Sequence, residues 1–203
     1  MRLHNIPGLM SKGNPVAVLF TEKEGEPSSL LYCELIQKAR SGESFLIASQ
    51  GCKVGAYVLG ESEITPADYY YSANRYRDRN AAKSAVSALH RLARRANSIM
   101  IFPYTGGSFD VLLLFLKPEA AMRLVQAYSY QKGDLVEVKT GGIASVCSDC
   151  TAYPLQGKLG ISPGCKGSRK HSRYADEELV VGVPFHLAGE IDANLGRIPG
   201  TLE

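Results

Sequence analysis

The sequence predicts an α/β or α+β fold, a single domain over residues 1–203 with one mixed β-sheet packed by helices. Two observations lead to this prediction. Short β-branched runs alternate with helical patterns only loosely, because some strand patterns follow one another directly. A chain of 203 residues is also within the usual size of one domain, and no internal repeat, linker or low-complexity segment divides it.

The first half of the chain predicts two strands and a helix between them. Pro15–Phe20 (PVAVLF) is a short apolar run typical of a strand. We expect a helix that is capped by Ser28–Ser29 and continues to Arg40. Ser44–Ser49 is the second expected strand, and Cys52 falls in the turn that leads from it into a helix.

The second half predicts the centre of the sheet. A helix is expected over residues 80–96, followed by a strand at Ser98–Phe102. Phe109–Leu116 (FDVLLLFL) is apolar on both faces, which is typical of an interior strand. Pro118 begins a helix that ends near Lys132. The last expected elements are strands at Leu135–Val138 and Leu179–Val183 and a helix at Pro184–Leu195.

Composition limits the class of protein. A hydrophobic content of 45% with 21% charged residues is ordinary for a globular protein, and a net charge of +3 does not by itself indicate nucleic acid as a partner. The N-terminus lacks the apolar run of a signal peptide, and the longest apolar run, Val111–Leu116, is far shorter than the ~20 residues of a membrane span. We therefore expect a cytoplasmic protein, without membrane attachment, whose cysteines stay reduced.

The cysteines carry the main functional signal. Cys147 and Cys150 form a C-x2-C pair, a spacing that lets two thiolates hold one ion or cluster. Cys165 follows between glycines, which let the backbone bend closely around a ligand. At Cys52, the start of a helix would favour the thiolate form. Cys33 lies at the margin of the apolar face of its predicted helix.

These segments resemble the uncharacterised ArCR (archaeal Cys-rich) family, also called domain of unknown function 169. The resemblance covers most of the chain, through GNPVAVLF (13–20), GCKVGAYVLG (51–60), PEAAMRLVQAY (118–128), GGIASVC (141–147), SPGCKGSRK (162–170) and DEELVVGVP (176–184). In the family pattern the recurring cysteines correspond to Cys33, Cys52, Cys147 and Cys165, whereas Cys150 is an addition. The resemblance implies this cysteine set and an archaeal or anaerobic-bacterial setting, but no reaction.

Four recurring cysteines in a reducing compartment predict a [4Fe-4S] cluster with a redox role. Its expected ligands are Cys33, Cys52, Cys147 and Cys165, with Cys150 as an alternative ligand. Three alternatives stay open. The first is zinc bound by Cys147, Cys150, Cys165 and His171. The second is a reactive thiolate at Cys52 or Cys165 beside Lys53, Lys166 or Arg169. The third is a set of reduced structural cysteines.

Basic residues around Cys165 predict an anion site. Lys166, Ser168, Arg169 and Lys170 are expected to bind a small anionic ligand beside the cysteines. A binding module without catalysis would use this surface and residues 75–95 for an anion or RNA. The expected partners are thus a redox protein or a small anion, and a homo-oligomer is open. No nucleotide-binding or hydrolase motif is present, so the sequence does not decide whether the protein is an enzyme.

Overall fold

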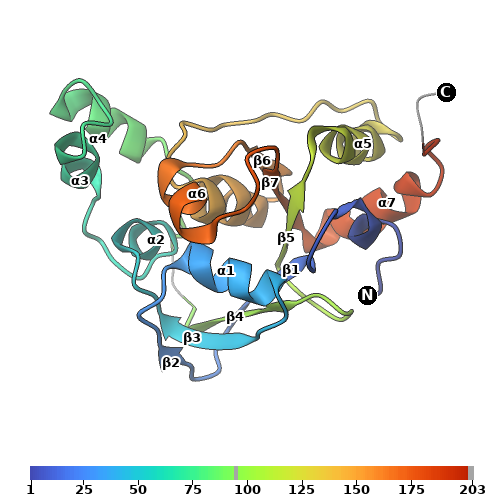
Figure 1. Cartoon of the computed structure of the whole chain (residues 1–203), viewed down its shortest axis with the longest axis horizontal. Coiled ribbons are helices and arrows are strands. Elements are labelled where there is room, and N and C mark those ends of the chain that lie inside the picture. Colours follow the sequence, from blue (N-terminus) through green and yellow to red (C-terminus); the bar gives the residue numbers. More distant parts are fainter. Residues whose placement is uncertain (94–95, 201–203) are drawn as a thin grey trace.

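The computed structural model describes residues 1–93 and 96–200. Within these residues the chain forms one seven-stranded mixed sheet with the strand order β2-β3-β4-β1-β5-β7-β6 (Figure 1). The strands are β1 (Val16–Thr21), β2 (Glu26–Pro27), β3 (Phe45–Ser49), β4 (Ser98–Pro103), β5 (Val111–Leu116), β6 (Gly160–Ser162) and β7 (Leu179–Pro184). Neighbours are antiparallel except β2 and β3, which are parallel. The predicted α/β architecture with one mixed sheet is confirmed.

Helices cover both faces of this sheet. The α-helices are α1 (Tyr32–Arg40), α2 (Lys53–Val58), α3 (Ala67–Ser72), α4 (Arg79–Ser87), α5 (Pro118–Ser129), α6 (Lys166–Ser172) and α7 (Phe185–Leu195). Three tighter or wider helices are η1 (Ile6–Leu9) and η3 (Pro154–Gln156), both 3₁₀, and the π-helix η2 (Ser145–Ala152). None of the helices in the described part of the chain combines the length and apolar character needed to cross a lipid bilayer.

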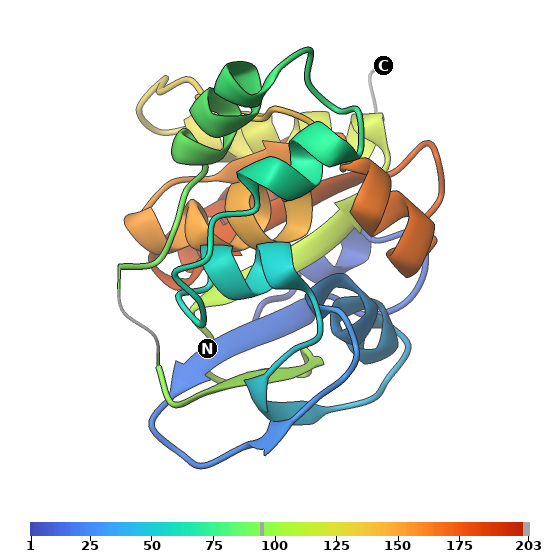
Figure 2. The same cartoon turned by 90° about the vertical axis from the view of Figure 1, so that its left-hand side faces the viewer.

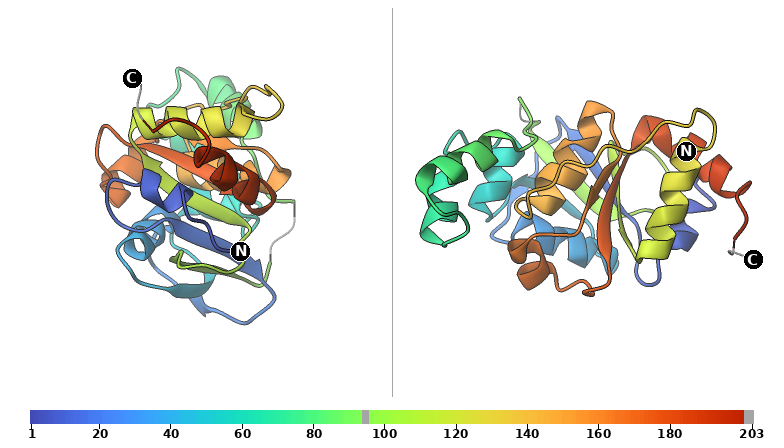
Figure 3. Two further views of the ribbon diagram at one scale, coloured as in Figure 1. Left: turned by 90° about the vertical axis from the view of Figure 1, so that its right-hand side faces the viewer. Right: turned by 90° about the horizontal axis from the view of Figure 1, so that it is seen from above.

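The interior strand β5 separates two hydrophobic layers. All six of its residues are 0% exposed. Val111, Leu113 and Phe115 pack with α1, α2 and η2 on one face, and the alternate leucines of the strand pack with α5, α7 and η1 on the other. Figure 3 shows from above that α5 and α7 lie on the opposite side of β7 from η2. The prediction of an interior strand here is confirmed.

Helices α3 and α4 form a small unit at one end of the molecule. Figure 1 shows them beyond α2, and Figure 2 views the molecule from that end. Their buried residues Ala67, Tyr70, Ala82 and Val86 form a separate cluster with Ile143 rather than joining the two main layers. This unit therefore rests on the loop before η2 and on α2, and it forms one wall of the cavity described below.

The start of α1 differs from the prediction. The helix begins at Tyr32, after a cap in which the Leu31 N–H donates to Glu34 Oε2 at 2.8 Å. Ser28 does not cap the helix: its Oγ accepts from the Leu30 N–H at 3.2 Å, before the helix begins, and its own N–H donates to Ser49 O at 2.9 Å. The preceding residues Glu26–Pro27 thereby become the unpredicted edge strand β2.

The helix predicted over residues 80–96 is shorter. Helix α4 ends at Ser87, because the following backbone is used for contacts with other elements. The His90 N–H donates to Ser148 Oγ at 3.0 Å, and the Leu92 N–H donates to Val58 O at 2.9 Å. Residues 94 and 95 of the predicted helix lie outside the described part of the chain.

The strand predicted at Leu135–Val138 is wrong. These residues have no regular structure, and Leu135 is 85% exposed. The free edge of β7 is occupied instead by β6, which pairs through Gly160–Ser162. Residues 135–138 pair with none of the seven strands of the described sheet.

Candidate functional site

A cavity of about 340 Å³ lies between α1, α2, α3, η2 and α6. Four cysteines from four separate elements line it, and we call them the four-cysteine set: Cys33, Cys52, Cys147 and Cys165. These are the cysteines expected as cluster ligands, and positions up to 132 residues apart in sequence meet here. The cavity belongs to the same layer as α1 and η2, on the face of the sheet away from α5 and α7.

Cys52 and Cys165 occupy equivalent positions at the starts of two helices. Each is the N-cap residue, and its Sγ accepts a hydrogen bond from a backbone N–H three residues later: Gly55 at 3.4 Å and Ser168 at 3.3 Å. Such contacts favour a negatively charged sulfur, because the N–H groups at a helix start have no partner within the helix. The expectation that Cys52 lies in a strand-to-helix turn is confirmed.

Cys33 is held beside them by a contact between two helices. Cys33 lies in the first turn of α1, and the Ser172 hydroxyl of α6 donates to its carbonyl oxygen at 2.8 Å. Since α6 begins at Cys165, this hydrogen bond ties the Cys33 helix to the Cys165 helix. Cys165 therefore lies at the start of a helix that packs on α1.

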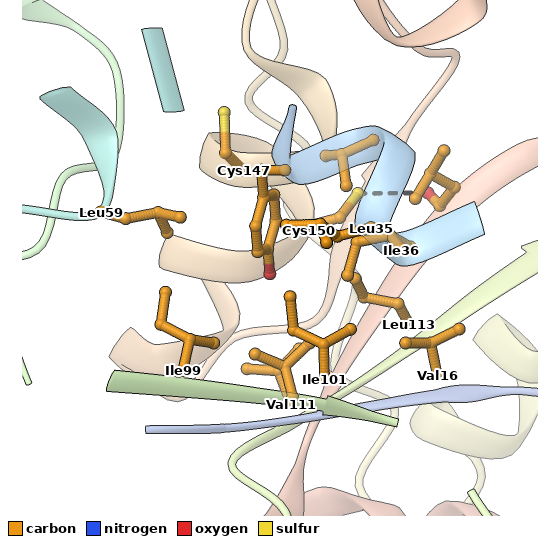
Figure 4. Close-up of a cluster of buried hydrophobic side chains, with 14 of the residues drawn as sticks. Val16, Leu35, Ile36, Leu59, Ile99, Ile101, Val111, Leu113, Cys147 and Cys150 are labelled. Atoms are coloured by element: carbon orange, nitrogen blue, oxygen red, sulfur yellow. Dashed lines mark hydrogen bonds between the residues drawn. The ribbon is translucent and has the colours of Figure 1, made fainter. Parts of the chain in front are cut away.

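Cys147 and Cys150 have different surroundings. Cys147 is 7% exposed and lines the cavity, whereas Cys150 is fully buried and its thiol donates to Val180 O of β7 at 3.3 Å. Figure 4 shows the two sulfurs pointing in different directions from η2. Gly182 permits this close packing, because a Cβ there would overlap the Cys150 carbonyl. The C-x2-C pair does not form one binding site.

The backbone that carries Cys147 has two uncommon features. The chain enters η2 through Ala144, a non-glycine residue with φ +52°, and such a conformation costs about 1 kcal/mol or more. The π-helix itself is a rare conformation that occurs frequently at functional sites. Together they direct Cys147 into the cavity while the following residues pack on the sheet.

Burial controls the acidity of the free thiols. Burial, with a smaller contribution from negative charge on Cys52 and Cys165, raises the pKa of Cys33 to about 12. Burial also raises the pKa of Cys52, and it raises the pKa of Cys147 well above its ordinary value. Because burial and neighbouring thiolates both oppose ionisation, the neutral forms of Cys33, Cys52 and Cys147 are favoured unless a cation compensates the charge.

Among the described residues, the donors at the cavity include four thiols that do not form a compact site for a single ion. Among residues 1–93 and 96–200, no three His, Cys, Asp or Glu side chains are close enough together to bind one ion. In a [4Fe-4S] cluster each thiolate binds its own iron, so four sulfurs surround a larger group. The four-cysteine set supplies four thiols around one cavity, which is the required number and type of ligand.

The set predicted for zinc does not come together. Cys147 and Cys165 line the cavity, and His171 lies at its edge with Nδ1 3.7 Å from Glu34 Oε1. Cys150 instead lies in the core against β7. This combination therefore offers at most three groups on the cavity, and they are not close enough to bind one ion.

The predicted anion residues are dispersed around α6. Ser168 lines the cavity, but Lys166 and Lys170 are exposed and do not. The Arg169 guanidinium donates to the carbonyls of Pro163, Ala175 and Glu178 and stacks on the Tyr174 ring, 4.8 Å from its centroid. Arg169 thus organises the chain around α6.

Other residues provide the positive charge at the cavity. Lys53 and Arg75 line it, with Tyr69 and Tyr70 from α3. From the sequence Lys53 was expected beside Cys52, whereas residues 75–95 suggested a nucleic-acid or anion surface and not a wall of the cysteine site. The apolar pair Ala67 and Tyr70, three residues apart, was the available signal that one face of this segment is buried.

Comparison with known proteins identifies the family. Residues 8–194 match the family described as Uncharacterised ArCR. The chain belongs to the ArCR family. The ArCR chain is also 32% identical over 164 residues to Uncharacterized protein MJ0308 of Methanocaldococcus jannaschii, which covers 75% of this chain and 70% of that protein. No solved structure matches. The resemblance stated from the sequence is confirmed, and neither match assigns a reaction.

Proposed function

We propose that this ArCR protein binds a [4Fe-4S] cluster through the four-cysteine set and uses it in a redox role in the cytoplasm. The observation that carries the proposal is the position of the four thiols: they come from α1, α2, η2 and α6 and line a single cavity. Packing of a hydrophobic core does not require four thiols to meet, since a cysteine such as Cys150 fills core space as a single buried thiol.

The electrostatics of the cavity support a cationic occupant. Thiols whose pKa is raised by burial and by one another bind a metal only if its charge replaces the lost protons. Iron ions supply this charge, and hydrogen bonds to the sulfurs of Cys52 and Cys165 stabilise the thiolates. Lys53 and Arg75 at the cavity would balance the remaining negative charge.

A redox role would require access for a partner. Cys33, Cys52 and Cys165 are only partly buried, so this side of the cavity reaches the surface. A redox protein could approach there without unfolding any element.

Anaerobic purification followed by iron and acid-labile sulfide analysis tests the proposal. We expect brown protein with about four iron atoms and four sulfides per chain. Colourless protein without iron from that preparation would overturn the proposal. One zinc per chain would overturn it as well, in favour of a single-ion site.

A matched pair of variants locates the ligands. Cys165→Ser should lower the iron content, because a ligand at the cavity is lost, whereas Cys150→Ala should keep it, because that thiol lies in the core. Melting temperatures of the iron-free forms separate loss of the cluster from loss of the fold.

A further inference from the structure

Two polar groups on the α3 side of the cavity have no partner in the described part of the chain. Tyr70 is 4% exposed and lines the cavity, and its hydroxyl makes no hydrogen bond with any described residue. The Arg75 guanidinium likewise makes no hydrogen bond or ion pair there, and its Nε is buried without a partner. Buried donors are nearly always satisfied in native proteins, so the Arg75 Nε is available to a ligand, and the Tyr70 hydroxyl has no competing partner among the described residues.

The turn after α3 brings the Arg75 backbone back against that of Tyr70. The Arg75 N–H donates to Tyr70 O at 3.0 Å, and Asn74 takes φ +50° where the chain reverses. Tyr70 is held in the small cluster with Ala67 and Ile143. The hydroxyl and the guanidinium are thus carried by one short segment that packs on the rest of the protein.

The α3 side of the cavity has the charge and surface of a site for an organic anion. Among the described residues that line it, Lys53 and Arg75 are cationic and none is Asp or Glu. Much of the remaining wall is apolar, formed by side chains such as Val54, Ile143 and Val146. The whole cavity has a volume of about 340 Å³, and small-molecule sites begin at about 300 Å³, so a ligand that shares it with the cluster must be small.

We infer that the cavity binds a small organic carboxylate whose apolar body packs on this wall and whose carboxylate is held by Arg75 and Tyr70. A guanidinium matches a carboxylate with two parallel hydrogen bonds, and the tyrosine hydroxyl adds a third. A dianionic phosphate would require more donors than this largely apolar wall offers. The inference rests on the proposed function for its redox meaning, since the ligand would lie next to the cluster.

The test uses calorimetric titration of the full chain, purified anaerobically, with benzoate as the probe. Benzamide is the matched neutral probe, and inorganic phosphate tests the alternative anion. We expect benzoate to bind at least about tenfold more tightly than either, because only it forms the charge-assisted pair. Equal affinity for benzoate and benzamide, or tighter binding of phosphate, would overturn the inference.

Variants assign the binding groups. Arg75→Gln should weaken benzoate binding by about tenfold or more, and Tyr70→Phe, which keeps the ring, by severalfold. Arg77→Gln is the control, because Arg77 is 92% exposed and pairs with Asp78 away from the cavity. Benzoate binding that is insensitive to Arg75→Gln contradicts the inference. A change in cluster potential in that variant without any carboxylate binding also contradicts it, since Arg75 would then serve the cluster alone.

Iron analysis of the same samples separates this inference from the proposed function. Protein with about four iron atoms that does not discriminate benzoate from benzamide retains the cluster and excludes the carboxylate site. Iron-free protein that binds benzoate through Arg75 retains the carboxylate site and excludes the cluster.

Discussion

Cys147 and Cys150 lie in the same π-helix, but only Cys147 lines the cavity, while the Cys150 thiol donates a hydrogen bond to Val180 O of the sheet. The two sulfurs therefore take different roles although their spacing is that of a metal-binding pair. Close packing of η2 on β7 at Gly182 determines this difference.

The first prediction compares these two cysteines. Cys147→Ser should reduce the iron content of anaerobically purified protein, because it removes one of the four thiols at the cavity. Cys150→Ala should leave the iron content unchanged and lower the stability by about 1 kcal/mol, the cost of a small core cavity. Iron analysis and chemical denaturation measure the two effects. Equal loss of iron in both variants would contradict the assignment.

A second prediction concerns the reactivity of Cys33. Burial raises its pKa to about 12, so only roughly one molecule in 10⁵ carries a thiolate at pH 7. Alkylating agents react with the thiolate. Iodoacetamide should therefore label Cys33 in folded, iron-free protein at least about a hundredfold more slowly than in urea-unfolded protein. Mass spectrometry of the digested protein measures both rates. Rapid labelling in the folded state would instead support a reactive-thiol role.

A third prediction addresses the buried ion pair of Arg40 and Glu178, which joins the end of α1 to the segment before β7. Arg40 Nη1 and Glu178 Oε2 are 3.0 Å apart, a second Nη2–Oε1 contact completes the pair, and both side chains are at most 4% exposed. Glu178→Gln should destabilise the fold by about 3 kcal/mol, because Arg40 would remain buried without its countercharge. Urea denaturation measures this difference.

The exposed pair Lys38–Glu43 provides the control for Glu178→Gln. Its side chains are 45% and 53% exposed, so Glu43→Gln should cost less than about 1 kcal/mol. A similar loss of stability in both variants would contradict the prediction, because the buried pair would then contribute no more than the exposed one.

The same ion pair predicts a pH dependence. Burial raises the pKa of Glu178, but hydrogen bonds from Arg40 and the Ala175 N–H outweigh it, and the pKa is lowered. An ionised carboxylate with a lowered pKa stabilises the fold above its ordinary pKa of about 4.3, and this stabilisation is lost as the pH falls through the folded value. The stability difference between the natural chain and Glu178→Gln should therefore shrink between pH 7 and about pH 3. A constant difference would contradict it.

A fourth prediction concerns Asp149, whose contribution to stability changes with pH in the opposite direction to that of Glu178. Burial raises the pKa of Asp149 to about 6, although the Ser162 hydroxyl donates to its carboxylate at 2.9 Å. The stability that the neutral acid contributes to the fold is fully present below its ordinary pKa of about 3.9. It is lost as the pH rises through the raised pKa of the folded protein. Between pH 4 and pH 8, the free energy of unfolding of Asp149→Asn should therefore rise by about 2 to 3 kcal/mol relative to that of the natural chain. Urea denaturation of iron-free protein at both pH values measures this gain.

Much of the fold followed from local pattern. The apolar run at β5 and the proline at the start of α5 predicted elements that the structure contains, because interior strands and helix starts have characteristic residue patterns. The edge strands β2 and β6 were not predicted, since they are short and their backbone hydrogen bonds depend on distant partners. The end of α4 could not be predicted for the same reason, because contacts with η2 and α2 determine it.

By itself the sequence determined the family, the mixed α/β class and the candidate cysteines, because motifs and residue types are local properties of the chain. The tertiary structure alone decided that four cysteines share a cavity while Cys150 joins the core. It also decided that Arg75 and Lys53 are the cationic residues that line the cavity. The Arg169 guanidinium instead donates hydrogen bonds to backbone carbonyls near its own helix. These outcomes depend on how elements far apart in sequence pack together, and spacing along the chain does not encode the direction in which each side chain points.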